Sequence, residues 1–313
     1  MVRLGIVSPC YNEEGVLSIS AGKLANILTD LGEKGKISSD SFVLFVNDGS
    51  KDSTWNIIKS LHNEDSRFKG LNLARNVGHQ NAIMAGMMTA KDWADVVVTI
   101  DADIQDDIYA IEKMIDEYED GADVVYGIKV SRKADPFLKR MSALAFYNLQ
   151  KKMGVNCVYN HADFRLMSNR ALNMLAEYPE KNLYLRALIT NIGLPSATVE
   201  DVIVEREAGQ SKYTLSKMLN LAVDGITSFS IKPIYLIFYI GLIFLAISIF
   251  ILGNVIYSKL TGSAISGWAS QILSIWFVGG ALMVGIATVG IYIGKIYTEV
   301  KARPLYHIQE ILK

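Results

Sequence analysis

Val96-Val-Val-Thr-Ile100, followed directly by Asp101-Ala-Asp103-Ile-Gln105, is the stretch that decides the fold. Its first half carries no charge and, apart from one threonine, is aliphatic, as in a strand buried on both faces of a sheet. Its second half brings two carboxylates and an amide immediately after that strand. In parallel sheets, ligands bind beyond the carboxyl ends of the strands. The stretch therefore predicts a central strand that carries polar side chains to a binding site.

Similar short runs of branched and aromatic residues recur along the first half of the chain, separated by helix-patterned stretches. This alternation predicts an α/β fold, in which a mainly parallel sheet is covered by helices on both faces. The expected strands are 4–7, 42–46, 71–73, 96–100 and 124–126, and the expected helices are about 15–31, 53–62, 79–91 and 107–119.

The C-terminal third has a different composition, because no charged residue lies between Lys232 and Lys259 or between Lys259 and Lys295. Residues 234–257 and about 271–294 are each long enough, as helices, to cross a hydrocarbon core of about 30 Å. Basic residues lie mainly outside this pair, which predicts that both termini are cytoplasmic. The alternative is a helical hairpin buried inside a soluble protein.

Two stretches, 137–153 and 215–229, place apolar residues on one helical face. Each is either an ordinary core-facing helix or a helix lying in the membrane interface, and the second lies close to the expected spans. The predicted organisation is a cytoplasmic α/β domain (1–213), a juxtamembrane amphipathic helix (214–232), a two-helix transmembrane hairpin (233–296) and a cytoplasmic tail (297–313).

Bulk composition excludes several classes of protein. The 313-residue chain has a formal net charge of −1, which argues against general nucleic-acid binding. Cys10 and Cys157 are too few for a disulfide framework or a zinc site, and they suit a reducing compartment. The N-terminal sequence lacks the apolar run of a signal peptide, so the first domain is expected to stay in the cytoplasm.

Asp101, Asp103 and Gln105 are candidate metal ligands. Alternation along an extended chain would point all three in the same direction. Oxygen ligands of this kind suit a hard divalent cation such as Mg²⁺ or Mn²⁺. Such a cation bridges phosphates and neutralises the charge of a leaving nucleotide diphosphate. The alternative interpretation is a solvated acidic turn.

Polar residues also follow the first two expected strands. Tyr11 could stack on a base, and Glu13 and Asp48 could accept hydrogen bonds from a base or a ribose hydroxyl. The same segments contain good turn and helix-capping residues, and those structural roles are compatible with binding. Neither a P-loop pattern nor a glycine-rich dinucleotide fingerprint occurs in the sequence.

Six segments in order carry a resemblance that runs along the whole chain: PCYNEE at 9–14, VNDGSKDST at 46–54, LARNVGHQ at 73–80, DADIQD at 101–106, NHADFRLM at 160–167 and REAGQSKY at 206–213. Together with the two apolar spans, they resemble family 2 glycosyltransferases with the Rossmann-like GT-A fold. Within that family, the likeness is to polyisoprenyl-phosphate glycosyltransferases, which include dolichol-phosphate mannose synthases and bactoprenol glucosyltransferases.

The resemblance implies a role for each matching residue. The nucleotide-sugar side comprises Pro9, Tyr11, Glu13, Val46, Asp48, Asp101, Ala102, Asp103 and Lys129. The metal ligands would be Asp101, Asp103 and Gln105. Arg132, Arg206 and Lys212 would contact the acceptor phosphate, although the family's pattern also allows Arg206 and Lys212 to meet a phosphate of the donor. The catalytic residues would be Asp103 and Asp163.

The implied reaction is inverting transfer of a hexose, glucose from UDP-glucose as the first choice, to undecaprenyl phosphate at the plasma membrane. GDP-mannose and UDP-N-acetylhexosamine are alternative donors, and a homo-oligomer is possible. A phosphate monoester is largely a dianion at pH 7, so Asp163 acts either as a base or as an orienting residue. The nearby His161 is more often structural than a substrate contact.

There are two rival interpretations, of which the first shares the fold and the second comes from a different class of protein. A processive polysaccharide synthase would carry more spans and a Gln-x-x-Arg-Trp motif, whereas the corresponding region, 182–187, has an arginine but no tryptophan. An inactive membrane scaffold would not need Asp101, Asp103, Arg206 and Lys212. Glycosylation of a lipid by the purified protein would separate an enzyme from a scaffold.

Overall fold

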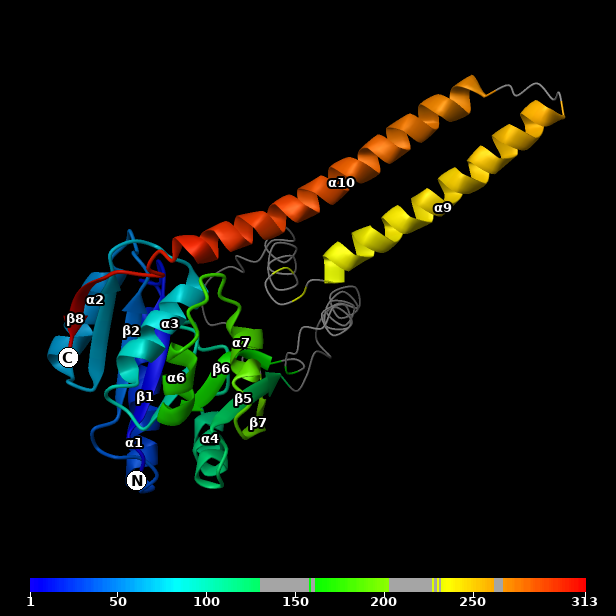
Figure 1. Cartoon of the computed structure of the whole chain (residues 1–313). Coiled ribbons are helices and arrows are strands. Elements are labelled where there is room, and N and C mark those ends of the chain that lie inside the picture. Colours follow the sequence, from blue (N-terminus) through cyan, green and yellow to red (C-terminus); the bar gives the residue numbers. More distant parts are fainter. Residues whose placement is uncertain (130–157, 159–160, 203–226, 228–229, 231, 262–266) are drawn as a thin grey trace.

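The computed structural model describes residues 1–129, 158, 161–202, 227, 230, 232–261 and 267–313. It shows an α/β domain from which two long helices extend (Figure 1). The strands are β1 (Leu4–Cys10), β2 (Phe42–Asn47), β3 (Phe68–Leu73), β4 (Val96–Thr99), β5 (Val124–Lys129), β6 (His161–Ser168), β7 (Ser196–Asp201) and β8 (Ile308–Leu312). The helices are α1 (Leu17–Glu33), α2 (Thr54–Glu64), α3 (His79–Ala90), α4 (Ala110–Glu119), α6 (Asn169–Ala176), α7 (Leu185–Asn191), α9 (Lys232–Leu260) and α10 (Trp268–Lys301).

The described strands form one sheet with the order β7-β5-β6-β4-β1-β2-β3-β8. The pairs β1–β2, β1–β4, β2–β3 and β5–β7 are parallel, which confirms the mainly parallel sheet. Two strands run against the rest: β6 lies between β4 and β5, and β8 pairs with β3 at the edge.

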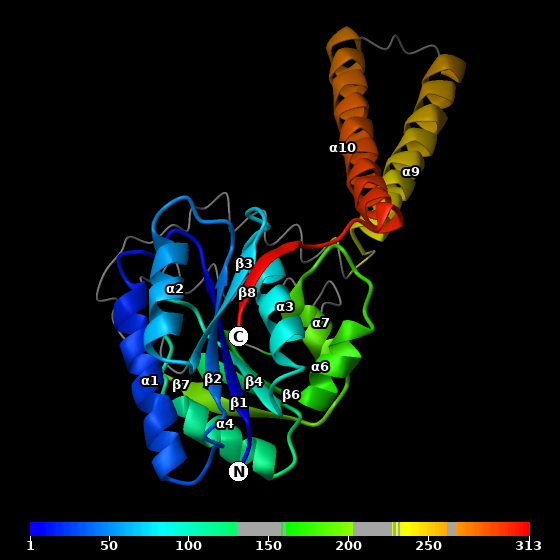
Figure 2. The same ribbon diagram turned by 90° about the vertical axis from the view of Figure 1, so that its left-hand side faces the viewer.

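Helices cover both faces of the sheet, as the alternating pattern predicts. Helices α1, α2 and α4 lie on one face, and α3, α6 and α7 lie on the other (Figure 2). Alternate residues of the central strands enter opposite cores: Ile6 and Val98 pack with the first group of helices, and Val7 and Val97 with the second. Gly86 lets α3 approach closely, since a Cβ there would lie 2.3 Å from Val7 Cγ1.

The predicted strands and helices of the first 130 residues are all present, with ends that shift by up to three residues. Strand β3, for example, begins three residues earlier than predicted, at Phe68, because pairing with β2 extends the strand through Lys69 and Gly70. Strands β6, β7 and β8 were not predicted as strands. The amphipathic stretches 137–153 and 215–229 lie outside the described residues.

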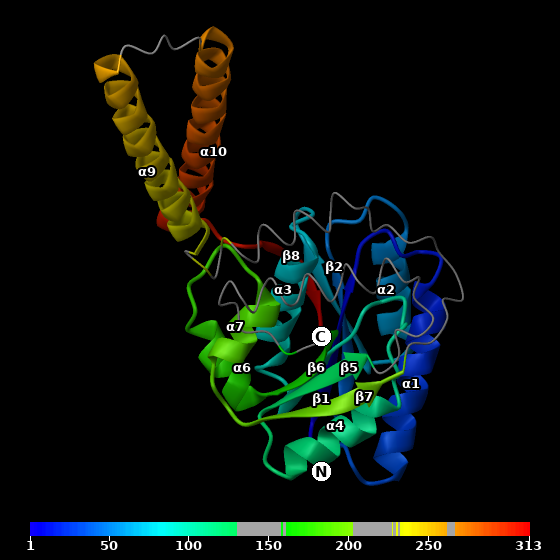
Figure 3. The same ribbon diagram turned by 90° about the vertical axis from the view of Figure 1, so that its right-hand side faces the viewer.

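The two apolar stretches form α9 and α10, which project together away from the sheet (Figures 1 and 3). Large apolar side chains on both are exposed, for example Phe250 (73%) and Met283 (67%). Among the described residues, one helical segment, Phe277–Lys301, is long and apolar enough to cross a membrane, and none of its most apolar window is buried.

The C-terminal residues return to the α/β domain after α10. Residues 308–312, expected in a tail, form β8 and add an antiparallel strand to the edge of the sheet beside β3. The Glu310 carboxylate accepts a hydrogen bond from Trp55 Nε1 (3.2 Å) and pairs with Lys59 Nζ (3.0 Å). The end of α10 is therefore tied to the same sheet that carries the polar strand ends.

Candidate active site

The polar site lies at the carboxyl ends of the central strands, where β6 places a second set of charged residues beside β4. In the antiparallel pairing of these strands, Thr99 lies opposite Arg165. Continuing that register by two residues brings Asp163 level with Asp101. Thr99 Oγ1 also donates a hydrogen bond to the main-chain oxygen of Asp163, which fixes the start of β6.

The segment from Asp101 to Gln105 is a turn, so the extended alternation expected for it is wrong. Strand β4 ends at Thr99, the Ile104 N–H donates to the Asp101 carbonyl (3.1 Å), and Ile104 has a positive φ of 43°. The turn forms because Ile104 and Ala102 fold back into the core next to α1 and α4. Asp101, Asp103 and Gln105 share this turn, but strand geometry does not set their directions.

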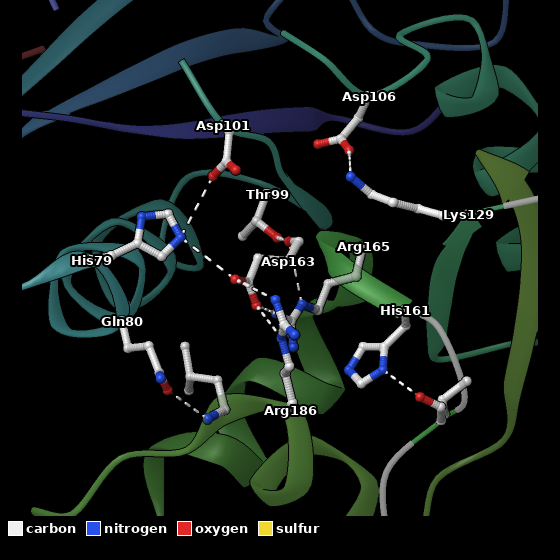
Figure 4. A network of polar contacts seen from close by, with 12 residues as sticks. His79, Gln80, Thr99, Asp101, Asp106, Lys129, His161, Asp163, Arg165 and Arg186 are labelled. Atoms are coloured by element: carbon white, nitrogen blue, oxygen red, sulfur yellow. Dashed lines mark hydrogen bonds and ion pairs between the residues drawn. The ribbon is translucent and has the colours of Figure 1, made fainter. Parts of the chain in front are cut away.

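Asp163 is the centre of a charged network (Figure 4). Its carboxylate accepts a hydrogen bond from Arg165 Nη2 (2.6 Å) and lies 3.3 Å from Arg186 Nη2. His79 Nε2 lies 3.5 Å from Asp163 Oδ2 and 3.5 Å from Asp101 Oδ1, so it bridges the two aspartates. Arg165 lies in β6, His79 in α3 and Arg186 in α7, and Asp101 follows the end of β4.

The electrostatics of this network keep Asp163 ionised. Burial alone would raise the pKa of its carboxyl, but the charge of Arg186, the hydrogen bond from His79 and the charge of Arg165 outweigh burial and hold the pKa well below its ordinary value. Burial would likewise lower the pKa of His79, but Asp163 and Asp101 raise it to about 9. Asp163 is therefore an anchored anion and a weak proton acceptor.

Asp101 presents an oxygen that suits a cation. Its Oδ1 atom is buried and has no hydrogen-bond donor, although the side chain as a whole is 49% exposed. Burial raises the pKa of its carboxyl, with the charge of His79 acting against that shift. His79 Nε2, 3.5 Å away, compensates part of the charge on this buried oxygen, and a metal ion would compensate it further. The donor set at this turn is thus compatible with a hard metal ion.

The set is small for a protein-only metal site. Within the described ranges, no three His, Cys, Asp or Glu side chains gather as a metal cluster. The predicted ligands are two carboxylates and one amide, and Mg²⁺ is commonly held by one or two carboxylates together with substrate phosphates. These residues fit a cation that shares its coordination with a bound diphosphate.

The residues predicted around the nucleoside divide into two groups. Tyr11 is 40% exposed beyond the end of β1 and is accessible for stacking. The side chains of Pro9, Val46 and Ala102 are buried, and Pro9 lies opposite Val46 in the β1–β2 pairing.

Asp48 has a structural role that the sequence analysis also allowed. It is 3% exposed, and its two oxygens accept the main-chain N–H groups of Val77 (2.7 Å) and Gly78 (3.1 Å). These contacts hold the loop that precedes α3. The adjacent Gly49 has a φ of 62°, and a Cβ there would lie 2.4 Å from the Asn76 nitrogen, so only glycine permits this close approach.

Lys129, predicted to contact a donor phosphate, pairs with Asp106 Oδ1 at 3.3 Å (Figure 4). Asp106 is 4% exposed, and burial, together with the nearby Asp101 and Asp201 charges, raises its pKa to about 8 despite Lys129. Lys129 is therefore held by an acidic partner at the end of β5. Sequence reasoning did not single out Asp106, although it belongs to the quoted DADIQD segment.

His161 is a core residue. It is 2% exposed, its Nδ1 lies 2.6 Å from the Val158 carbonyl, and its ring packs edge-on against Tyr126. Because a carbonyl only accepts, Nδ1 carries the proton. Burial and the charge of Arg165 lower the pKa of His161 to about 3, so the ring is neutral.

Three residues of the site were not predicted, and three predicted residues lie outside the described part of the chain. His79, Arg165 and Arg186 were not assigned roles, although all lie in stretches that the sequence comparison quoted. Arg165 and Arg186 each interrupt an otherwise apolar segment, whereas His79 lies in a polar one, and only the tertiary structure brings the three together. The predicted acceptor-side cations are the three outside the described residues: Arg132, Arg206 and Lys212.

Comparison with known proteins places this chain in a family. A model of "Glycosyl transferase family 2" matches residues 5–175. The chain is 47% identical over 305 residues to the uncharacterized glycosyltransferase YkoT of Bacillus subtilis (strain 168), covering 97% of this chain and 90% of that protein. It is 36% identical over 312 residues to the SfII prophage-derived bactoprenol glucosyl transferase of Shigella flexneri, covering 99% and 98%.

A solved structure supports the same fold. Glucosyl-3-phosphoglycerate synthase from Mycobacterium tuberculosis, in complex with phosphoglyceric acid, superposes with a TM-score of 0.50 at 15% identity, over 73% of this chain and 79% of that one. The α/β sheet is thus of the GT-A, Rossmann-like kind. With the family model covering more than half of the chain and relatives aligned over nearly all of it, this protein belongs to glycosyl transferase family 2.

Proposed function

We propose that the chain transfers a hexose, glucose in the first instance, from a nucleotide-sugar to polyprenyl phosphate at the cytoplasmic face of a membrane. The observation that carries this proposal is a carboxylate site at the strand ends in a domain joined to α10, a long helix with exposed apolar side chains. The full-length likeness to a bactoprenol glucosyl transferase supports a lipid acceptor. UDP-glucose and undecaprenyl phosphate are the substrates to test first.

Asp101, Asp103 and Gln105 would hold a divalent cation, Mg²⁺ or Mn²⁺, beside the donor diphosphate. When bound, the cation neutralises charge on the departing nucleotide diphosphate. The buried oxygen of Asp101 without a hydrogen-bond donor supports this assignment. Tyr11 stacks on the base from the end of β1, and the neighbouring Glu13 accepts hydrogen bonds from the nucleoside.

The reaction is a single displacement. An oxygen of the lipid phosphate attacks the anomeric carbon, and the bond from that carbon to the diphosphate oxygen breaks with both electrons going to the diphosphate. The configuration at carbon inverts. Because the phosphate is already largely a dianion at pH 7, no strong base is required. Asp163, held by two arginines and His79, orients the sugar or the acceptor rather than removing a proton.

The acceptor phosphate is met near the membrane. Arg206 and Lys212 precede the first apolar helix in sequence, and Arg132 follows Lys129, which pairs with Asp106. A lipid phosphate cannot rise far from the headgroup plane without exposing its tail, at about 0.8 kcal/mol per methylene. Cations close to that plane are therefore the proposed acceptor ligands.

Transfer assays test this function. Purified full-length protein in lipid nanodiscs receives undecaprenyl phosphate and, separately, labelled UDP-glucose, GDP-mannose and UDP-N-acetylglucosamine. We expect a labelled lipid with UDP-glucose and at least tenfold less product with the other two donors, a ratio within reach of differential transition-state binding. A labelled product with GDP-mannose alone would replace the proposed donor, and no lipid product with any donor would refute the function.

The proposed membrane arrangement is a two-span hairpin of α9 and α10, with both termini and the α/β domain cytoplasmic. Cysteine labelling tests it in a Cys157→Ser background, where the remaining Cys10 is buried. Ser263→Cys, in the connection between the helices, should react with an impermeant maleimide added to intact cells. Ser18→Cys and Arg303→Cys, both at exposed positions, should react only after lysis. The reverse pattern would invert the topology and separate the site from cytoplasmic nucleotide-sugars.

A further inference from the structure

An acidic residue at the end of α10 contacts the loop that leads into the site. Between Asp224 and Glu299 the chain contains no acidic residue, and Glu299 lies in the last turn of α10, beside Lys301. A carboxylate is unfavourable at a helix C-terminus, where the helix dipole is already negative. Other contacts are therefore needed to offset the unfavourable interaction between the Glu299 carboxylate and the helix dipole.

Those contacts come from the main chain of a distant loop. Glu299 Oε1 accepts the N–H groups of Lys181 (2.9 Å) and Asn182 (2.8 Å), and Glu299 Oε2 also lies 2.9 Å from the Lys181 nitrogen. The Asn182 side-chain amide donates to Glu299 Oε1 (2.6 Å) and to the Lys295 carbonyl (3.3 Å). Hydrogen bonds from N–H groups to an ionised carboxylate are about twice as strong as neutral ones.

The loop held in this way runs directly into the charged network. Helix α7 begins at Leu185, three residues after Asn182, and its first turn carries Arg186. The Leu185 N–H donates to Gln80 Oε1 (2.9 Å), so the residue next to His79 holds the same loop from the other side (Figure 4). Arg186 then meets Asp163, with Nη2 3.3 Å from Oδ2.

We infer that Glu299 is a positioning residue. Its contact between the end of helix α10 and the α/β domain keeps Arg186 aligned with Asp163. Glu299, Lys181 and Asn182 together are called the Glu299 clamp. Glu299 contacts Lys181 and Asn182, and it fixes the loop whose other end presents Arg186. For its kinetic consequence, this inference rests on the proposed transfer reaction.

The physical basis is the sensitivity of transfer to geometry. A misplacement of about 1 Å, caused by a change far from the chemistry, can slow a reaction by about 100-fold. Releasing the clamp leaves α7 attached through Gln80 and its buried residues Leu185 and Leu188, so the domain stays folded while the loop before Arg186 loses its hydrogen bonds to α10. The donor site on β1 and β4 is not touched.

The test compares Glu299→Ala with Glu299→Gln in full-length protein in nanodiscs. The matched control is Thr298→Ala, whose hydroxyl donates only within its own helix, to the Gly294 carbonyl. Glu299→Ala should lower kcat by roughly 10- to 100-fold and leave the Kd for nucleotide diphosphate unchanged. Glu299→Gln keeps a carbonyl oxygen that accepts the hydrogen bonds from Asn182, so its kcat should lie closer to that of wild type.

Hydrogen exchange gives a readout that does not depend on activity. In Glu299→Ala, the amides of Lys181 and Asn182 should exchange at least about tenfold faster than in wild type, while those of β1 and β4 keep their rates. Asn182→Ala removes the side-chain hydrogen bonds to Glu299 and to the Lys295 carbonyl but keeps the main-chain ones, so it should show a smaller increase at the same amides, and it serves if Glu299→Ala does not fold.

Two failures are distinguishable. A wild-type chain that transfers no sugar to any lipid refutes the proposed function, while the exchange comparison still decides on the clamp. Unchanged exchange at Lys181 and Asn182 in Glu299→Ala, or wild-type kcat in that variant, overturns the clamp even when the enzyme is active. Equal losses of kcat and nucleotide affinity also overturn it, because they indicate general damage to the domain.

Discussion

Asp101→Asn is expected to reduce sugar transfer by roughly a thousandfold, which corresponds to about 4 kcal/mol of transition-state stabilisation. The substitution keeps the size of the side chain but removes the charge that would hold a divalent cation against the donor diphosphate. Its Oδ1 is buried and lacks a hydrogen-bond donor, and the His79 ring that lies 3.5 Å away is shared with Asp163, so it does not replace a metal ion. The measurement is kcat/KM for the donor at saturating Mg²⁺ or Mn²⁺.

A matched control is Asp92→Asn, which removes one charge from an exposed aspartate paired with Lys91, after the C-terminal end of α3. This variant should retain wild-type kcat/KM. A chelator should abolish transfer by wild type, and added Mn²⁺ should restore it. Wild-type activity of Asp101→Asn in the presence of chelator would show that the turn after β4 binds no metal.

Asp163→Asn should both destabilise the domain and inactivate it. Arg165 is fully buried, and removing the carboxylate leaves its charge without its main partner, which costs roughly 3–5 kcal/mol of stability. The measurement pairs chemical unfolding of the domain with a transfer assay. Unchanged stability and activity would mean that the network around Asp163 has neither role.

A double variant separates the two effects. Asp163→Asn/Arg165→Met removes the buried cation together with its partner, and such replacements are often nearly neutral for stability. We therefore expect stability to recover while transfer stays low, because Arg186 and His79 still lack the carboxylate that aligns them. Recovery of transfer together with stability would assign Asp163 a structural role only.

The lowered pKa of Asp163 also predicts how stability and transfer rate depend on pH. A depressed pKa means that Asp163 contributes stability above its unfolded pKa, about 3.9, and loses that contribution as the pH falls through the lower folded value. Its charge therefore does not change between about pH 5 and pH 8. Titration of Asp163 should therefore not shape the pH dependence of the transfer rate in this range. Every rise or fall of the rate with pH that wild type shows there should also be present in Asp163→Asn/Arg165→Met.

Local patterns in the sequence were sufficient to identify the strands and helices whose apolar residues recur with the period of a strand or a helix. The apolar run before Asp101 and the alternation of strands with amphipathic helices identified the first five strands and the four helices between them. Uninterrupted apolar composition likewise identified α9 and α10. In each case the signal lies within about 20 neighbouring residues, because burial on one or both faces selects the residue types directly.

Local patterns did not reveal β6, β7 and β8. Strand β6 contains the fully buried Arg165, which interrupts the apolar pattern and is compatible with the core only because Asp163 neutralises it. The edge strand β8 is largely exposed and alternates weakly, so its pairing with β3 is the feature that defines it. These strands depend on partners far away in the sequence.

The sequence by itself determined the family, the α/β sheet, the carboxylates after β4 and the apolar helices. Only the tertiary structure decided that Asp163 faces Asp101 across His79, and that Glu299 holds the loop before Arg186. The physical reason is that residue type and spacing report how one segment buries its own surface. Contacts between ionised groups arise from the register of non-neighbouring strands and from the place where a distant helix ends.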